Sequence, residues 1–295
     1  MKRAFTKHSF RLQSFKSELH LIPYNQVKAI LFFALILSSI MAIAQPVDLK
    51  TMQSLPKDLE LKDELQKYDV TTVHFNTDIF CHFLNKIRVH GEYTRGLKDG
   101  MVQWNNVSVA MSMAEKGDFP KGEPVNYMEN FTYLPGEDMI QADKFESFTE
   151  YADYTKNLVW DMLGIEGFAW HSFDKLQLNV PYSAADFNGK IDLAGNGFFE
   201  NNDVVLTWTG VSFRNGENCA IIDYRTLRNP LEVSSDAMEM KGRSHYWGTI
   251  WVSLEDKQIE HAVLYEDVIM EILFPGQTQK QLLNATREIT VKKVL

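Results

Sequence analysis

The chain has 295 residues, of which 45% are hydrophobic and 23% are charged, and its formal net charge is −9. These ordinary globular proportions exclude a disordered chain, a collagen-like repeat and a small disulfide-rich protein. The negative charge argues against binding to a nucleic-acid backbone as the main role.

The N-terminal region carries a pattern typical of secretory signal peptides. Lys28 precedes an apolar run from Ala29 to Ala44, and the run ends in Ala42-Ile43-Ala44, which fits an A-x-A cleavage site. A membrane anchor is the alternative, but it needs about 20 apolar residues, more than this run provides. We therefore predict an export leader over residues 1–44. Within it, residues 27–44 form the signal peptide, and residues 1–26 are interpreted as a misassigned start.

Export implies a bacterial protein that becomes periplasmic or extracellular after cleavage, with membrane contact only through the leader before cleavage. Residues 45–67 contain Pro46, Pro56 and many charges, which indicates a linker or one short helix. No linker rich in Pro, Gly or Ser interrupts residues 115–295. We therefore expect residues 68–295 to form a single domain.

The first part of this domain is predicted to be rich in strands. Residues 70–75 are β-branched and aromatic, and residues 87–93 alternate apolar and polar side chains. Residues 101–113 alternate too, with a bend expected at Trp104-Asn105-Asn106. Turn residues occupy 96–100, and residues 117–124 are expected to form a loop.

A long amphipathic helix is predicted from about Lys144 to Leu163. Its apolar face is spaced by alternating steps of three and four residues, through Phe145, Phe148, Ala152, Thr155, Val159 and Met162. Asp143 and Glu146 fit a capping box, and Gly164 fits a left-handed stop. A second short helix is expected around Phe168, Trp170 and Phe173.

The C-terminal part is predicted to return to strands. Residues 203–213 and 219–225 flank Asn215-Gly216, which is a strong hairpin signal. Residues 243–294 are predicted to form a three-stranded meander with turns at 255–257 and at Pro275-Gly276. The middle segment, 259–274, also fits a helix, but the strand interpretation gives its neighbours a pairing partner.

The two cysteines do not have the spacing of a redox or zinc motif. Cys81 and Cys219 both occur in apolar segments that read as buried strands. An oxidising compartment permits a bridge between them, although two free core thiols are the preferred interpretation.

No strong catalytic or nucleotide-binding motif is present in the chain. The chain lacks a P-loop, a dinucleotide fingerprint, a G-x-S-x-G elbow and an HExxH zinc pair. We therefore expect no metal and no cofactor, and whether the protein is an enzyme stays open.

The stretch from Lys241 to Trp251 is the richest in polar and aromatic residues. Trp247 and Trp251 could present flat apolar faces to a ligand, with Arg243 and His245 binding polar groups. The alternative is a core strand whose tryptophans pack on the predicted helix. Pairing across the 255–257 turn places His245 opposite Asp267, which makes these two weak candidates for an acid/base pair, metal ligands or a plain ion pair.

Together these patterns predict an α+β protein, mainly antiparallel β, in which a curved sheet or open barrel packs on one long amphipathic helix. We expect an exported binding protein for an apolar or amphiphilic small ligand, held between the sheet and the aromatic face of the helix. One alternative is a secreted hydrolase or isomerase of glycans or lipids that uses a His–carboxylate pair. Another is a structural envelope module. No nucleic-acid partner is expected, and the oligomeric state is left undetermined.

Overall fold

A computed structural model describes residues 52–62, 64–235 and 238–295 of the chain. The predicted leader, residues 1–44, lies outside the described residues, as does the start of the predicted linker. All of the described residues belong to the C-terminal unit, Leu49–Leu295.

Thirteen strands and one α-helix make up most of the described chain. The strands are β1 (Gln66–Asp78), β2 (Phe83–Arg95), β3 (Val102–Ser112), β4 (Glu123–Pro124), β5 (Phe131–Tyr133), β6 (Tyr182–Ser183), β7 (Gly189–Asp192), β8 (Gly197–Asn201), β9 (Val205–Arg214), β10 (Glu217–Ser235), β11 (Met238–Ser253), β12 (Ile259–Leu273) and β13 (Gln281–Lys293). The α-helix is α2 (Ala152–Trp170), and the short 3-10 helices are η1 (Lys98–Gly100), η2 (Asn126–Met128), η3 (Glu137–Ile140), η4 (Ala142–Phe145), η5 (Phe173–Lys175) and η6 (Ala185–Phe187).

All of these strands belong to one antiparallel sheet. Its order is β4-β3-β2-β1-β13-β12-β11-β10-β8-β7, with β9 also paired to β10, β6 paired to β9 and β5 paired to β3. Within the described ranges no pairing joins β4 to β7, so the sheet does not close. The predicted class, mainly antiparallel β with one α-helix, is confirmed at this level.

The predicted hairpin and meander are both present. β9 and β10 join through Asn215 (φ 52°) and Gly216 (φ 93°), a pair of left-handed residues that suits a tight hairpin. β11, β12 and β13 form the predicted meander, and β12 is a strand because it pairs along most of its length on both sides. The predicted bend in β3 also occurs: Asn106 has a φ of 52°, next to a register shift in the β2–β3 pairing.

The predicted helix is displaced along the chain. α2 runs from Ala152 to Trp170, rather than from 144 to 163. Tyr151, immediately before it, has a left-handed φ of 63°, which interrupts any helix from the preceding residues. Phe145 and Phe148 are buried as predicted, but they reach the core from η4 and the turn that follows it.

The predicted helix ends are therefore wrong. Asp143 and Glu146 cap nothing in α2, and Gly164 lies inside the helix instead of stopping it. The second helix predicted near Phe168 is the last part of α2, followed by η5. Ile165, Phe168 and Ala169 extend the buried face of α2 past the predicted stop, which is why the helix continues.

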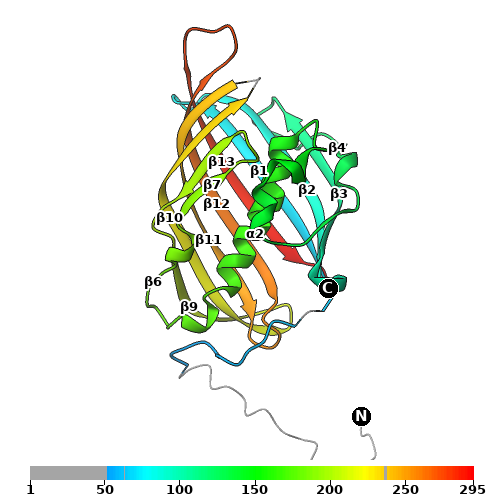
Figure 1. The fold of residues 1–295 in the computed structure, drawn as a ribbon, viewed down its shortest axis with the longest axis vertical. Helices are drawn as coiled ribbons and strands as arrows, with labels where there is room; N and C mark the ends of the chain where they lie inside the picture. Colours follow the sequence, from blue (N-terminus) through cyan, green and yellow to red (C-terminus); the bar gives the residue numbers. More distant parts are fainter. Residues whose placement is uncertain (1–51, 63, 236–237) are drawn as a thin grey trace, which may run out of the picture. The chain divides into compact units, whose positions relative to one another are not determined.

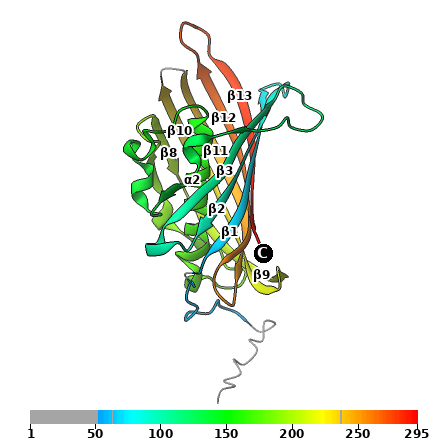
Figure 2. The ribbon, with the colours of Figure 1, turned by 90° about the vertical axis from the view of Figure 1, so that its right-hand side faces the viewer.

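α2 lies across one face of the sheet (Figures 1 and 2). It contacts β11 and β12, and the Phe168 ring packs 5.0 Å from Tyr224 and 6.2 Å from Tyr246. In β11 the buried residues alternate through Ser244, Tyr246, Gly248, Ile250 and Val252. We call the face that meets α2 the inner face and the opposite one the outer face.

The segment that leads from β5 through η3 and η4 to α2, which we call the strap, crosses the inner side of the open sheet. β5 pairs with β3 near one edge, and η3 follows β5 in the chain. The carbonyl of Ile140 in η3 accepts a 3.2 Å hydrogen bond from the amide of Ala194, in the turn between β7 and β8 at the other edge. Trp160 of α2 donates to the carbonyl of Met139 at 2.9 Å, which fixes the strap to the helix.

The described part of the predicted linker, residues 52–62 and 64–65, contains no helix. Leu55 is buried in the core at 1% exposure, Leu65 is exposed, and β1 begins at Gln66. Cys81 is not a buried strand residue: it is exposed, in the turn between β1 and β2, with a φ of 64°. Cys219 is buried in β10, and both thiols are free.

Candidate functional site

The polarity of the side chains on the inner face changes along the strands. Because successive side chains of a strand point to opposite faces, the register assigns the inner residues row by row. One row contains Tyr246, Glu266, Arg287 and His74, and it meets α2 from Tyr154 to Phe168. The next row toward the β1–β2 turn is mostly polar, and in the two rows after it the inner side chains of β10 to β12 are apolar.

A buried charge cluster fastens α2 to the sheet. Arg287 of β13 donates two hydrogen bonds to Asp161 of α2, at 2.8 and 3.0 Å, and one to Glu266 of β12 at 2.7 Å. The three side chains are only 10–11% exposed. Burial raises the pKa of Asp161 to about 6, against the lowering effect of Arg287. The cluster is internally paired, which favours a structural role.

His74 lies beside this cluster and carries no charge at neutral pH. Burial lowers the pKa of its imidazole to about 3, and the nearby Arg287 acts in the same direction. Its ring packs edge-on against Tyr154 of α2, with centroids 5.1 Å apart. A neutral histidine thus supports the first part of the helix by packing.

A second polar contact fixes the C-terminal half of α2. Tyr93 of β2 donates a 3.0 Å hydrogen bond to Glu166, and Arg95 lies 3.5 Å from the same carboxylate. Burial raises the pKa of Glu166 to about 7, although Arg95 and Tyr93 oppose that shift. Trp170, at the helix end, donates to the carbonyl of Lys257 and lies under the Arg95 guanidinium.

Beyond the start of α2, the inner side chains of β10 to β13 form an apolar strip. In Figure 1 these strands continue past the helix. The strip consists of Leu231, Val233, Met240, Val268, Met270, Ile272 and Leu283. Val268 and Ile272 are buried, and the other five side chains are half-buried. Asn76 and Asn85 lie in the same row as Val268 and hydrogen bond to each other at 2.8 Å.

The predicted aromatic platform lies on the outer face, away from α2. Trp247 is 45% exposed and its ring lies 6.1 Å from that of Tyr265, nearly parallel to it. Trp251 is half-buried beneath the Arg214 guanidinium, and Arg243 is exposed. The alternative in which these tryptophans pack on the helix is therefore wrong. A ligand held between sheet and helix would not touch them either.

His245 and Asp267 are direct register partners, as the turn predicted. Within the described residues, no hydrogen bond or ion pair joins their side chains. His245 Nδ1 lies 3.2 Å from the amide of Arg228, its hydrogen-bond donor, and Asp267 Oδ1 has no hydrogen-bond partner among the described residues. The two residues are thus neighbours on the outer face whose side chains do not hydrogen bond to each other in this structure.

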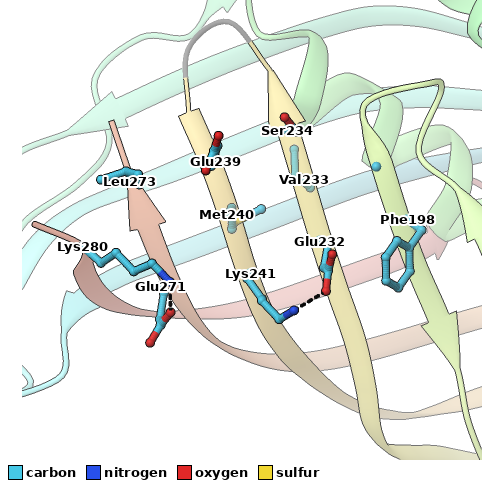
Figure 3. Close-up of a pocket in the computed structure, with 11 residues that line it drawn as sticks. Phe198, Glu232, Val233, Ser234, Glu239, Met240, Lys241, Glu271, Leu273 and Lys280 are labelled. Carbon is cyan, nitrogen blue, oxygen red and sulfur yellow. Dashed lines mark hydrogen bonds and ion pairs between the residues drawn. The ribbon is translucent and has the colours of Figure 1, made fainter. Parts of the chain in front are cut away.

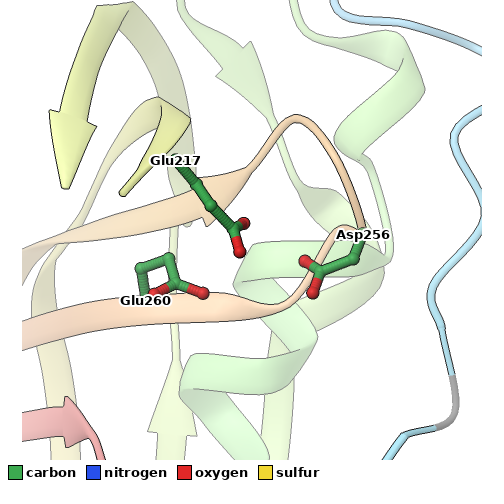
Figure 4. A group of neighbouring side chains, drawn as sticks. All are labelled: Glu217, Asp256 and Glu260. Carbon is green, nitrogen blue, oxygen red and sulfur yellow. The ribbon is translucent and has the colours of Figure 1, made fainter. Parts of the chain in front are cut away.

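Sequence analysis missed an acidic cluster at the opposite end of the sheet from the β1–β2 turn. Carboxylate oxygens of Glu217, Asp256 and Glu260 lie within 4.8 Å of one another (Figure 4). Each already accepts a hydrogen bond: Glu217 from Ser253, Asp256 from the amide of Gln258, and Glu260 from Lys293 and Asn215. These bonds tie the β9–β10 turn to the β11–β12 turn. The spacing of these residues in the sequence does not predict the cluster, because its members come from in and beside two separate turns.

An open hollow of about 330 Å³ lies near the ends of β8, β10, β11 and β12 (Figure 3). Two ion pairs border it, Lys241 with Glu232 and Lys280 with Glu271. The charged side chains are largely accessible to solvent, which suits water better than an apolar ligand. Val233 and Met240 also line the hollow, so it adjoins one end of the apolar strip.

No protein-family model matches the chain, and no curated protein matches it either. Among solved structures, one reporting lipid–protein interactions in lipovitellin aligns with 78% of this chain at 11% identity and a TM-score of 0.37; this chain covers only 25% of that one. A DUF1329 family protein from Desulfovibrio piger aligns with 78% of this chain and 86% of its own, at 9% identity and a TM-score of 0.13. Scores this low support no conclusion about fold or function.

One negative finding concerns membranes. Among the residues that the structure describes, no helix combines the length and the apolar character needed to span a bilayer.

Proposed function

We propose that this protein is an exported binding protein of the cell envelope that holds an apolar or amphiphilic small ligand on the apolar strip. The export part rests on the signal-peptide pattern of residues 27–44. The binding part rests on the strip and its position beyond α2.

The observation that carries the proposal is the predominance of apolar inner side chains in β10 to β12 at this end of the sheet; the polar members of the two rows are Asp78 in β1 and Gln281 in β13. Leu231, Met270 and Leu283 share one row with Gly242, and Val233, Met240 and Ile272 occupy the next. A soluble sheet normally covers such a face with another layer. α2 covers only the rows nearer the other end, which leaves half-buried apolar surface available to a ligand.

The side chains of the strip suit an adaptable site. Methionine is unbranched and polarizable, so Met240 and Met270 can adjust to ligands of differing shape. Transferring a methylene group from water to such a surface is worth about 0.8 kcal/mol. The amide groups of Asn76 and Asn85, one row nearer α2, would face the polar end of an amphiphile.

Two neighbouring residues provide a matched test. Met270 belongs to the strip, whereas Ile269 is on the outer face with 51% exposure. We expect Met270→Gln to weaken binding of a fluorescent fatty-acid probe about tenfold, by removing apolar contact. Ile269→Gln should leave binding unchanged. Equal effects of both variants, or no binding by the parent protein, would contradict the proposal.

A mass measurement can identify the chemical class of the natural ligand. Native mass spectrometry of the protein purified from its own host should show an added mass that is lost on denaturation. A hydrolase acting through His245 and Asp267 remains the alternative, and it predicts that His245→Ala abolishes turnover without changing the melting temperature. Retained probe binding in that variant is expected if the strip is the site.

A further inference from the structure

The turn between β1 and β2 exposes two consecutive apolar side chains at the end of the sheet that carries the apolar strip. Ile79 is 45% exposed and Phe80 is 73% exposed. They directly follow Asp78, whose register partner is Leu283 of the strip. Met113, just after β3 at this same end, is 72% exposed.

The turn is built to hold these side chains outward. One carboxylate oxygen of Asp78 accepts hydrogen bonds from the amides of Phe80 and His82, at 2.8 and 2.9 Å. The other oxygen lies 2.8 Å from His82 Nδ1, and the Asp78 carbonyl accepts from the amide of Cys81. The Asp78 side chain thus holds Phe80 and His82, and its backbone carbonyl holds Cys81. Because these hydrogen bonds order the turn, its backbone conformation keeps the Phe80 side chain exposed.

We propose that this end of the sheet docks on a lipid surface, with Ile79, Phe80 and Met113 inserted among the lipids at the entrance to the apolar strip. The inference rests on the proposed function, since a carrier of apolar ligands must exchange them with a surface that contains them. It adds a docking surface and a partner to the strip itself.

A lipid surface fits these residues better than a protein partner. Three protruding side chains offer far less contact than the roughly 800 Å² per partner that a stable protein interface buries. A few inserted apolar side chains are enough for weak, reversible membrane binding. The excess of acidic residues in the chain, with a net charge of −9, argues against attraction to anionic lipid. The docking should therefore occur on zwitterionic vesicles and resist added salt.

Phe213 provides a matched control. It is 72% exposed, almost the same as Phe80, and it precedes the β9–β10 turn at the opposite end of the sheet (Figure 1). Phe80→Trp and Phe213→Trp, each in the full chain, place an added indole at the two ends. The remainder of the chain, including any leader, contributes equally to both variants.

With phosphatidylcholine vesicles, we expect the emission of Phe80→Trp to shift to shorter wavelength and to be quenched by brominated acyl chains. Phe213→Trp should do neither, and salt at about 1 M, which shortens the screening length to about 3 Å, should not reverse the effect. The double variant Ile79→Ser/Phe80→Ser should partition into vesicles at least about tenfold more weakly than Phe213→Ser. No shift at position 80, or equal shifts at both positions, would overturn the proposal.

The two proposals fail in different ways. Ile79→Ser/Phe80→Ser should bind the soluble fatty-acid probe normally, and Met270→Gln should retain vesicle insertion while losing the probe. If position 80 inserts but Met270→Gln binds the probe like the parent, the docking surface stands and the apolar strip is refuted as the ligand site. Because Ile79, Phe80 and Phe213 are exposed, unchanged melting temperatures are expected for the variants at these three positions.

Discussion

Replacing Arg287 by methionine should strongly destabilise the protein, because Arg287 is the only cation that contacts both Asp161 and Glu266 among the described ion pairs. The side chain makes three hydrogen bonds of 2.7–3.0 Å to these carboxylates, and all three groups are 10–11% exposed. Arg287→Met leaves two buried carboxylates facing each other without compensation. Removing one partner of such a buried cluster typically destabilises by about 3–5 kcal/mol.

The pH dependence of this loss has a definite sign. Burial already raises the pKa of Asp161 to about 6, and removing Arg287 removes the main influence that lowers it. A carboxyl whose pKa is raised in the folded state favours folding at low pH and loses that contribution as the pH rises through the raised value. The deficit of Arg287→Met should therefore be smaller at pH 5 than at pH 8.

Urea unfolding at both pH values measures the effect, with two controls. Lys280→Met removes the partner of Glu271 in an exposed pair and should leave the unfolding midpoint unchanged. The triple replacement Asp161→Leu/Glu266→Met/Arg287→Met removes all the buried charges and should recover most of the stability. A loss below about 1 kcal/mol for Arg287→Met would refute the argument that this cluster is tightly desolvated.

Three further predictions follow from individual residues. Burial raises the pKa of Glu166 to about 7 from an ordinary 4.5, so its contribution to folding is largest below about pH 4.5 and is lost as the pH rises through 7. In Glu166→Gln, the change in the unfolding free energy between pH 5 and 8, measured by urea unfolding, should therefore be smaller by on the order of 3 kcal/mol. Gly164→Ala should raise the unfolding free energy by about 0.5–1 kcal/mol, because an added Cβ meets nothing within 4 Å. Gly167→Ala is the control: its Cβ would meet Phe187 at 2.9 Å, so it should not stabilise the protein. A destabilising effect of Gly164→Ala would favour the left-handed stop instead. A thiol reagent at pH 8 should label Cys81 and spare Cys219, which is buried and whose pKa burial raises to about 12; equal labelling of the native protein would contradict the placement of these residues.

Sequence patterns predicted the strands well because their signals are local. The Asn215-Gly216 turn and the 255–257 turn each fix the register of the strands beside them, so the pairings of His245 with Asp267 and of Trp251 with His261 could be counted in advance. The interpretation of 259–274 as a strand succeeded for a related reason. The apolar spacing of this segment fits both a helix and a strand, but the strands on either side of it needed a pairing partner.

The helix shows where a correct periodicity gives a wrong boundary. Phe145 and Phe148 share the spacing of the residues that follow, and all of them are buried in the same core. Only the left-handed backbone of Tyr151 separates the strap from α2. Two 3-10 turns and a helix can present apolar side chains to one core at the same spacing, so the pattern alone does not distinguish them.

The sequence by itself determined the two faces of β11, with His245, Trp247 and Trp251 on one and Tyr246, Ile250 and Val252 on the other. It did not determine which face meets the helix, because alternation is a property of one strand and the choice of covering layer depends on residues far away in the chain. Arg287 shows this most clearly. It joins Asp161 across 126 residues of chain, and that buried contact fixes α2 on the inner face. Which part of the inner face α2 covers is therefore decided by long-range packing.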